Sequence, residues 1–293
     1  MLAWRFRRVG GCERSGAQKV RTRLGTRFAV LGLSFWVVAV AAGTLSGQEM
    51  GLLRESRVGH LNMSEQNSDS DLSAQNAATA DTAVATALRG APDGEGFPAA
   101  EAWDRAVPVQ FSADWQGKHA DADRATEVRL LWTPSMLYLK FVARYKVITV
   151  FSDAGANGRR DKLWDRDVAE VFLQPEPSAA RRYKEFEVSP NGFWIDLDID
   201  LDAKGDLKDL HSGLRRRVKI DEQAKTWTAE VAIPMKSLVA HFDAAATWRA
   251  NFYRIEGDSE PRFYSAWRAT NTEKPNFHVP ERFGYLKFAS AER

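Results

Sequence analysis

Residues 183–202 read Y-K-E-F-E-V-S-P-N-G-F-W-I-D-L-D-I-D-L-D. Apolar and acidic residues alternate in both halves, a period of two that indicates strands with one buried face. The S-P-N-G between them, at 189–192, is typical of a turn, so this segment is predicted to be a β-hairpin. If both apolar sets enter one core, both acidic sets emerge on one outer face. Like charges on neighbouring strands repel, so that face is expected to find cations from Arg254, Arg262, residues 215–217 or bound calcium. The alternative is a solvated acidic face.

The same kind of strand recurs along the chain, as short runs rich in β-branched and aromatic residues that Pro, Gly and Asp separate. Strands are predicted at residues 107–112, 126–132, 137–145, 168–173, 183–188, 193–201, 214–220, 226–233, 248–256, 262–267 and 283–288. One short helix, with Pro at its start, is predicted at residues 98–106. Many short strands without helices between them indicate an all-β fold, an antiparallel two-sheet β-sandwich of the jelly-roll kind.

A candidate binding site lies in residues 161–173, D-K-L-W-D-R-D-V-A-E-V-F-L. Trp164 stands at the mouth of a predicted strand and Glu170 within it. A flat apolar ring stacks on the C–H face of a sugar, and a carboxylate accepts hydrogen bonds from neighbouring hydroxyls. The aromatic stretch 248–267 ends in Trp267, which, if exposed, would complete a clamp around both faces of a sugar ring. The alternatives are core tryptophans and a solvated strand glutamate.

Charge and hydropathy divide the chain before this folded part. The first 30 residues carry eight Lys or Arg and one acid, a balance of +7, so the remainder of this +2 chain is at −5. No basic surface is therefore expected to bind nucleic acid. The uncharged run at 28–45 predicts a signal peptide or N-terminal anchor over 1–46 and export to the periplasm, cell envelope or exterior. A membrane is involved only if that segment stays uncleaved.

Two further regions follow the export segment. Residues 47–88 are rich in Ser, Asn, Gln, Ala and Thr and have no aromatic residue, which predicts a disordered linker. Eight of the ten tryptophans lie in residues 89–291, which predicts one folded domain with a single core. The only cysteine, Cys12, precedes the apolar run, so the exported part has no disulfide.

Several blocks of the domain resemble the family 9 carbohydrate-binding modules and their DOMON-type relatives. The matching blocks, in family order, are L-W-D-R-D-V-A-E-V-F-L at 163–173, Y-K-E-F-E-V-S-P-N-G at 183–192, W-T-A-E-V-A-I-P at 227–234, N-F-Y-R at 251–254, Y-S-A-W at 264–267 and P-N-F-H-V-P-E-R-F-G at 275–284. The resemblance implies a β-sandwich that holds a terminal sugar between two Trp rings. By motif, Trp164 and Trp267 look like these rings and Glu170 like the acceptor of a sugar hydroxyl. Glu187 lies where the family can carry an Arg, which implies a different ligand chemistry.

The resemblance also implies polar contacts and calcium. Asn251 and Arg254 are the further candidate ligand contacts. Modules of this kind carry calcium ions that stabilise loops, and the acidic residues placed for one here are Asp161, Asp165 and Asp167. No organic cofactor is expected. The implied partner is a mono- or oligosaccharide or the end of a polysaccharide, bound by a stand-alone module or one that serves a partner enzyme in polysaccharide breakdown or uptake.

Two other functions remain open on the sequence. Glu170 and Glu187 could provide the paired carboxylates of a glycoside hydrolase, but nothing singles out an acid and a base, and no known catalytic motif occurs. We therefore predict that the protein is not an enzyme. Some relatives of the sandwich bind haem, for which His278, Met235 and Met136 are the available axial ligands.

Overall fold

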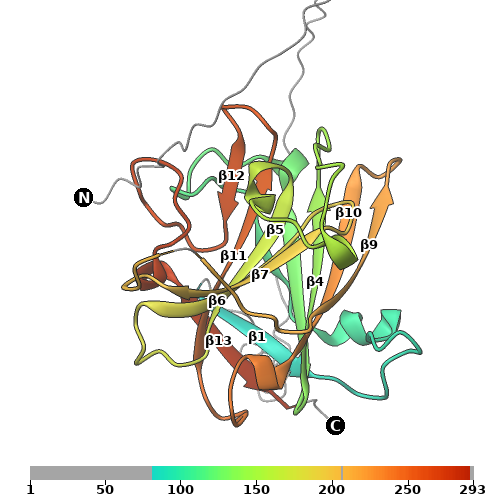
Figure 1. Cartoon of the computed structure of the whole chain (residues 1–293). Coiled ribbons are helices and arrows are strands. Elements are labelled where there is room, and N and C mark those ends of the chain that lie inside the picture. Colours follow the sequence, from blue (N-terminus) through green and yellow to red (C-terminus); the bar gives the residue numbers. More distant parts are fainter. Residues whose placement is uncertain (1–80, 206, 291–293) are drawn as a thin grey trace, which may run out of the picture. The chain divides into compact units, whose positions relative to one another are not determined.

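The computed structural model describes residues 81–205 and 207–290. The predicted export segment and most of the predicted linker lie outside this part. The regular secondary structure of the described chain is nearly all strand, with a few short 3₁₀ helices between the strands (Figure 1). None of these helices is long and apolar enough to cross a membrane.

The strands join into one curled mixed sheet. They are β1 (Thr82–Ala87), β2 (Val109–Phe111), β3 (Thr126–Thr133), β4 (Met136–Arg144), β5 (Val168–Gln174), β6 (Arg182–Val188), β7 (Trp194–Asp200), β8 (Lys208–Asp209), β9 (Arg215–Asp221), β10 (Thr226–Pro234), β11 (Trp248–Glu256), β12 (Phe263–Ala266) and β13 (Gly284–Ala289). The 3₁₀ helices are η1 (Ala100–Arg105), η2 (Ala122–Arg124), η3 (Ala156–Gly158), η4 (Leu163–Asp165), η5 (Met235–Ser237) and η6 (Pro280–Arg282).

The strand order makes two halves that β1 connects. The sheet runs β8-β7-β6-β5-β11-β13-β1-β3-β4-β10-β9, with β12 added to β11 and β2 to β3. Strand β1 is parallel to both β13 and β3, and the other pairings are antiparallel. The predicted sandwich is therefore present, but its sheet is mixed rather than purely antiparallel, because one strand from the start of the domain closes the gap between the two halves.

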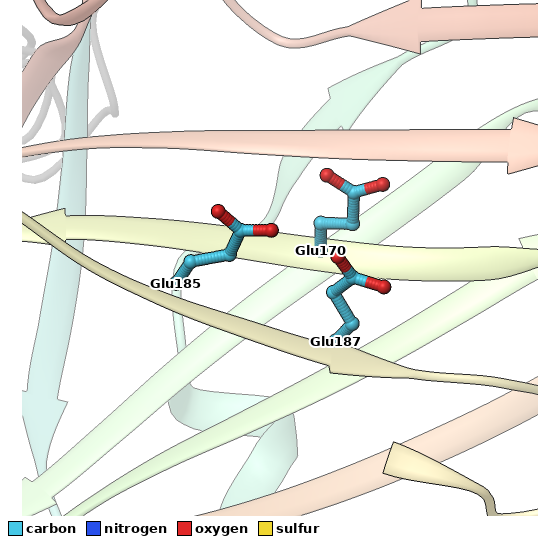
Figure 2. Close-up of side chains that lie close together, drawn as sticks. All are labelled: Glu170, Glu185 and Glu187. Atoms are coloured by element: carbon cyan, nitrogen blue, oxygen red, sulfur yellow. The ribbon is translucent and has the colours of Figure 1, made fainter. Parts of the chain in front are cut away.

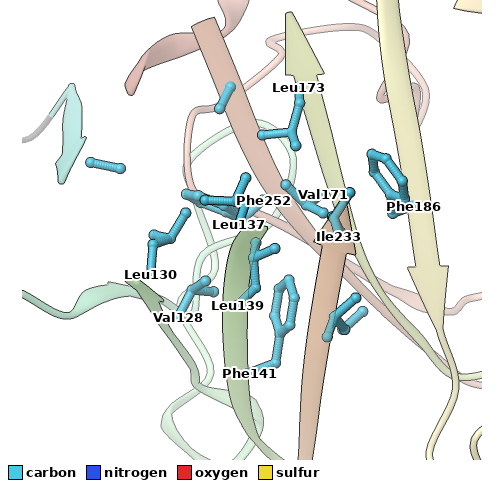
Figure 3. Close-up of a cluster of buried hydrophobic side chains, with 14 of the residues drawn as sticks. Val128, Leu130, Leu137, Leu139, Phe141, Val171, Leu173, Phe186, Ile233 and Phe252 are labelled. Carbon is cyan, nitrogen blue, oxygen red and sulfur yellow. The ribbon is translucent and has the colours of Figure 1, made fainter. Parts of the chain in front are cut away.

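The main core lies between the inner faces of the halves. Figure 3 shows Leu130 and Phe141 from one half, and Val171, Phe186 and Phe252 from the other, pointing into the same space. All five side chains are at most 2% exposed. Burial of this apolar surface is the dominant favourable term in folding, which fits a domain whose described residues contain no cysteine.

A second cluster covers the outer face of the half that contains β5, β6, β7 and β11. Because successive side chains of a strand point to opposite faces, Phe252 enters the main core while Tyr253 enters this outer cluster. Phe172 and Ile195 join Tyr253 there, and Phe277 from the segment before β13 covers them. The candidate site lies on this outer face.

The eleven predicted strands are all present, with ends that shift by a few residues. No α-helix forms at 98–106, where a short helix is predicted; a six-residue 3₁₀ helix, η1, lies there instead. The linker boundary is wrong at its end, because residues 82–87 form β1 rather than disordered chain. Ala83 and Ala85 are fully buried between β13 and β3, so the folded domain begins before residue 89.

The hairpin 183–202 forms, but its acidic residues do not share one face. Val188 pairs with Trp194, which leaves a loop of five residues, Ser189–Phe193, rather than the four expected. One extra residue reverses the facing of a whole strand relative to its neighbour. The acidic residues of β6 therefore lie beside the apolar residues of β7, as Glu187 does beside Ile195.

Candidate functional site

Three glutamates meet on the outer face because of the pairing of β5 with β6. Glu170 lies directly opposite Glu187, and Glu185 lies opposite Phe172 on the same face. Figure 2 shows the three side chains close together, one from β5 and two from β6. Their carboxylate oxygens, one from each residue, lie within 4.8 Å of one another. Like charges placed opposite each other on a sheet destabilise it, so this arrangement is unfavourable for folding alone.

These carboxylates are also removed from water. Glu170 and Glu185 are 2% exposed and Glu187 is fully buried. Within the described residues, no donor reaches Oε1 of Glu170, Oε2 of Glu185 or either carboxylate oxygen of Glu187. A buried acceptor without a donor loses its hydration without replacement, which costs free energy of folding.

The electrostatic consequence is a shift in protonation. Burial raises the pKa of the Glu170 carboxyl well above its usual range, repulsion from Glu185 adds to the rise, and the Arg262 guanidinium opposes it. Burial also raises the pKa of Glu187, reinforced by repulsion from Glu170, Glu185 and Asp165. The site thus disfavours charge on both carboxyls unless a ligand supplies compensation.

A pocket of about 300 Å³ opens above the carboxylates. Its lining residues are Trp164, Glu170, Phe172, Glu185, Glu187, Leu207, Ile255, Arg262, Tyr264, Pro275, Asn276, Phe277 and His278. The floor is therefore acidic and the walls are largely aromatic. This combination of apolar walls and a few convergent polar groups is typical of a small-ligand site.

The aromatic walls are fixed by contacts with the sheet. Trp164 lies half-buried on η4, and Arg262 donates a hydrogen bond from Nη1 to the Trp164 carbonyl oxygen at 2.7 Å. The Arg262 guanidinium also lies over the Tyr264 ring, 4.9 Å from its centroid. Phe277 stacks on Tyr253 with ring centroids 4.1 Å apart and an angle of 11° between the planes. The walls are therefore held in place without a ligand.

His278 closes one side of the pocket. Its Nδ1 is hydrogen bonded to the Tyr183 hydroxyl at 2.5 Å and lies 3.9 Å from Oε2 of Glu185. The two methionines considered with it as haem ligands lie elsewhere, because Met136 and Met235 line a separate hollow beside η5. The structure does not bring these three candidate haem ligands together.

Trp267 is not in the pocket. It follows β12 and packs on Phe252, with ring centroids 5.3 Å apart, against the main core. Its ring also approaches Gly284 so closely that a Cβ there would lie 2.6 Å from the Trp267 Cη2 atom. Trp164 packs against the outer cluster instead. The expected clamp of two facing indoles is therefore not formed, because the two rings belong to opposite faces of one half of the sheet.

Asn251 and Arg254 are both fully buried outside the pocket lining. The Asn251 Nδ2 donates to the Tyr253 hydroxyl at 2.8 Å and to the Arg268 carbonyl oxygen at 2.9 Å. Arg254 faces the interior, where its Nη2 lies 3.5 Å from Asp167 Oδ2. Both side chains hold the sheet together rather than facing the pocket.

The three aspartates placed for calcium do not form a donor set. Asp161 pairs with Arg159 at 2.6 Å. One oxygen of the buried Asp167 accepts hydrogen bonds from Thr149 Oγ1 and the Gly257 amide, both at 2.7 Å. Asp165 is half-buried, and among the described residues the three do not gather as a metal-binding group. These residues do not fit a calcium site, and calcium itself stays a prediction.

Six ligand contacts are predicted from the sequence, and three of them, Trp164, Glu170 and Glu187, line the pocket. Glu185 was not selected, although the alternation in Y-K-E-F-E-V puts it on the same face as Glu187. The remaining wall residues come from loops that fold over the sheet, and no local pattern marks them.

Comparison with known proteins reveals relatives in sequence and in structure. An extracellular protein of Arthroderma benhamiae is 24% identical in an alignment of 177 residues that covers 56% of this chain and 78% of that protein. A Bacteroides uniformis protein proposed to bind carbohydrate superposes with a TM-score of 0.58 at 17% identity, over 71% of this chain and 99% of its own. A family 9 carbohydrate-binding module of Caldicellulosiruptor kristjanssonii, also 17% identical, superposes in its cellotriose complex with a TM-score of 0.51, over 72% of this chain and 95% of its own. Its glucose complex gives 0.50, over 72% and 97%.

These structural likenesses show a shared fold. The sequence model of the carbohydrate family 9 binding domain-like family covers residues 93–291, nearly the whole described domain. The chain belongs to the carbohydrate family 9 binding domain-like family.

Proposed function

We propose that this protein is an exported carbohydrate-binding module that holds one terminal sugar residue in the outer-face pocket. In this role it supports the breakdown or uptake of a polysaccharide and catalyses no reaction itself. The family is one of carbohydrate-binding, non-catalytic modules. The solved relative of Caldicellulosiruptor kristjanssonii was obtained in complex with cellotriose and with glucose, which supports a sugar as the ligand class.

One observation carries the proposal: an aromatic wall and a carboxylate floor converge on one small pocket. Sugars present apolar C–H faces and hydroxyl edges, so they bind best where a ring stacks on the face and acceptors meet the edge. Trp164 and Tyr264 supply rings, and Glu170 supplies acceptor oxygens at the floor. A volume of about 300 Å³ lies at the small end of ligand pockets, which favours one sugar residue over a long groove.

Export is supported by two observations of different kinds. The N-terminal sequence has the basic and apolar segments of a signal peptide or anchor. The relative from Arthroderma benhamiae is described as an extracellular protein. Expression with and without residues 1–46, followed by fractionation, tests the proposal, because retention of the full chain in the cytoplasm would contradict it.

The test of sugar binding compares Trp164→Ala with Trp267→Phe. A glycan array identifies ligands of the wild type, and isothermal titration then measures affinity for the best one. Trp164→Ala should weaken binding by about tenfold or more, because loss of a ring platform removes at least ~1.4 kcal/mol of binding free energy. Trp267→Phe should retain wild-type affinity, because that ring packs on the core. Loss of affinity only in Trp267→Phe would contradict the assignment of the pocket.

Calcium is proposed only as a stabiliser outside the sugar contacts. The resemblance to the family is its sole support, because Asp161, Asp165 and Asp167 do not gather as a donor set. Thermal denaturation with calcium and with a chelator tests it. An unchanged midpoint would argue against a bound ion, and repeating the sugar titration in chelator would separate stabilisation from binding.

A further inference from the structure

The charges of the pocket do not balance. Three carboxylates line it, and Arg262 is the only Lys or Arg among the described lining residues. Arg262 has an acid of its own, since its Nε lies 3.4 Å from Oε1 of Glu260, outside the pocket. When ionised, the three carboxylates of the floor therefore outnumber the cations of the described lining, which are Arg262 and, if protonated, His278, 3.9 Å from Oε2 of Glu185.

In their ionised form, the three carboxylates of the floor accept hydrogen bonds and donate none. Four of the six carboxylate oxygens of Glu170, Glu185 and Glu187 are buried without a donor in the described residues. A ligand that satisfies them must bring several N–H or O–H donors to one point. Each of these buried acceptors has lost its hydrogen bonds to water, so a ligand that donates to it restores a hydrogen bond without a further cost of dehydrating the acceptor.

An ammonium group fits this point in number, charge and geometry. It carries three N–H donors directed at tetrahedral angles, and charge-assisted hydrogen bonds are about 2.7–2.9 Å long, so three acceptors around it lie about 4.4–4.7 Å apart. One oxygen from each glutamate lies within 4.8 Å of the other two, which is compatible with this arrangement. Its positive charge would also offset the repulsion between Glu170 and Glu187, which a neutral hydroxyl cannot do.

We infer that the pocket takes an amino sugar, whose ammonium group binds among Glu170, Glu185 and Glu187 while its ring stacks on the aromatic wall. This inference rests on the proposed function and specifies its ligand. The raised pKa of Glu170 and Glu187 has the same origin, because a cation among these carboxyls would oppose the burial and the repulsion that disfavour their ionised form.

A bare divalent cation is the competing ligand for three carboxylates. The pocket favours the sugar for two reasons. Its volume of about 300 Å³ greatly exceeds that of one ion, and Trp164, Phe172, Tyr264 and Phe277 offer rings rather than oxygens. An ion would leave these rings without a partner.

The experiment uses two trisaccharides that differ at one kind of group. Cellotriose and the fully deacetylated chitosan trimer have the same β-1,4 backbone, and the trimer carries an amine in place of one hydroxyl on each ring. Isothermal titration at about pH 6, where such amines are protonated, should show the chitosan trimer binding about tenfold or more tightly. Glucosamine and N-acetylglucosamine repeat the comparison on a single ring and separate a free sugar from a chain end.

Glutamine variants test which carboxylates produce the preference for the amino trimer. Glu185→Gln and Glu187→Gln should each reduce the preference for the amino trimer about tenfold, because each removes one charged acceptor. Glu230→Gln is the matched control: this glutamate lies on β10, outside the pocket, and pairs with Arg217 at 2.7 Å, so the preference should persist.

The outcomes distinguish a failure of the amino-sugar inference from a failure of the proposed carbohydrate-binding function. Equal or tighter binding of cellotriose would overturn the amino-sugar inference and leave the proposed function standing. Failure of both trimers and of every glycan on the array would overturn both. Titration with calcium and manganese chlorides is the last arm, and binding of either ion that is lost in Glu187→Gln and blocks the amino trimer would overturn the inference in favour of a metal site.

Discussion

Substitution of Glu187 by Gln should stabilise the ligand-free domain. The wild-type side chain is fully buried, and neither of its carboxylate oxygens meets a donor in the described residues. Leaving a buried polar group unsatisfied costs about 1–3 kcal/mol, and more if it is charged. Gln is nearly isosteric, carries no charge and brings an NH₂ group that can donate to Glu170 or Glu185. We expect the free energy of unfolding to rise by about 2 kcal/mol, which for a domain of this size raises Tm by roughly 4–8 °C.

The assay is thermal denaturation of the ligand-free domain at several pH values. Burial and like-charge repulsion raise the pKa of Glu187 above its value in the unfolded chain. The native state therefore holds the proton more tightly, and wild-type stability falls as pH rises from about 4.3, the unfolded pKa, through the raised folded pKa. The Tm advantage of Glu187→Gln should accordingly be small near pH 4 and largest at neutral pH. The groups that shape this response are Glu170, Glu185 and Asp165 around Glu187, and Arg262, which acts on Glu170.

The control substitution, Glu230→Gln, should change Tm in the opposite direction. Glu230 has its side chain 11% exposed but pairs with Arg217 at 2.7 Å, so Glu230→Gln should lower Tm. A Glu187→Gln domain that is no more stable than wild type at neutral pH, or an advantage that stays constant with pH, would refute the reasoning.

Two further predictions concern Arg254 and the packing of Trp267, which were both predicted as ligand contacts and are structural here. Arg254→Met should lower the free energy of unfolding by about 3–5 kcal/mol, because it leaves the buried Asp167 without its cation; urea denaturation measures this, and an unchanged midpoint would contradict the interior placement. Gly284→Ala should lower it by about 1–3 kcal/mol, because the new Cβ would lie 2.6 Å from the Trp267 ring and 2.7 Å from the Asp81 carbonyl oxygen. A Gly284→Ala domain as stable as wild type would mean that the Trp267 ring is not packed there.

Strand positions were predictable because large residues mark them. In β10 the sequence T-W-T-A-E-V-A-I-P combines β-branched and aromatic residues, and the strand forms at 226–234. Strand β1, T-A-V-A-T-A, carries only small and β-branched side chains and follows a polar segment. Its place between β13 and β3 depends on neighbours distant in sequence, which no local pattern reveals.

The site was only partly predictable for the same reason. Trp164 and Glu170 lie in one continuous stretch, and their local sequence was enough to select them. The role of Trp267 depends on the face of the sheet on which its ring lies, and the sequence was compatible with both a ligand contact and a place against the core. Its contact with Phe252 settles the choice, because Phe252 alternates with Tyr253 and points inward.

The five-residue loop after β6 links the fold to the chemistry of the pocket. With one residue fewer, the acids of β6 would face the same way as Asp196 on β7, and all would lie on one face. With the loop as it is, Glu185 and Glu187 lie beside Leu197 and Ile195, which are both 2% exposed, so the acids are enclosed by apolar side chains. Such an arrangement lowers the stability of the fold unless a ligand supplies the missing hydrogen bonds and charge. Arrangements that lower stability are common at functional sites. A stabilised Glu187→Gln domain that has also lost its preference for an amino sugar would show that one register choice produces both effects.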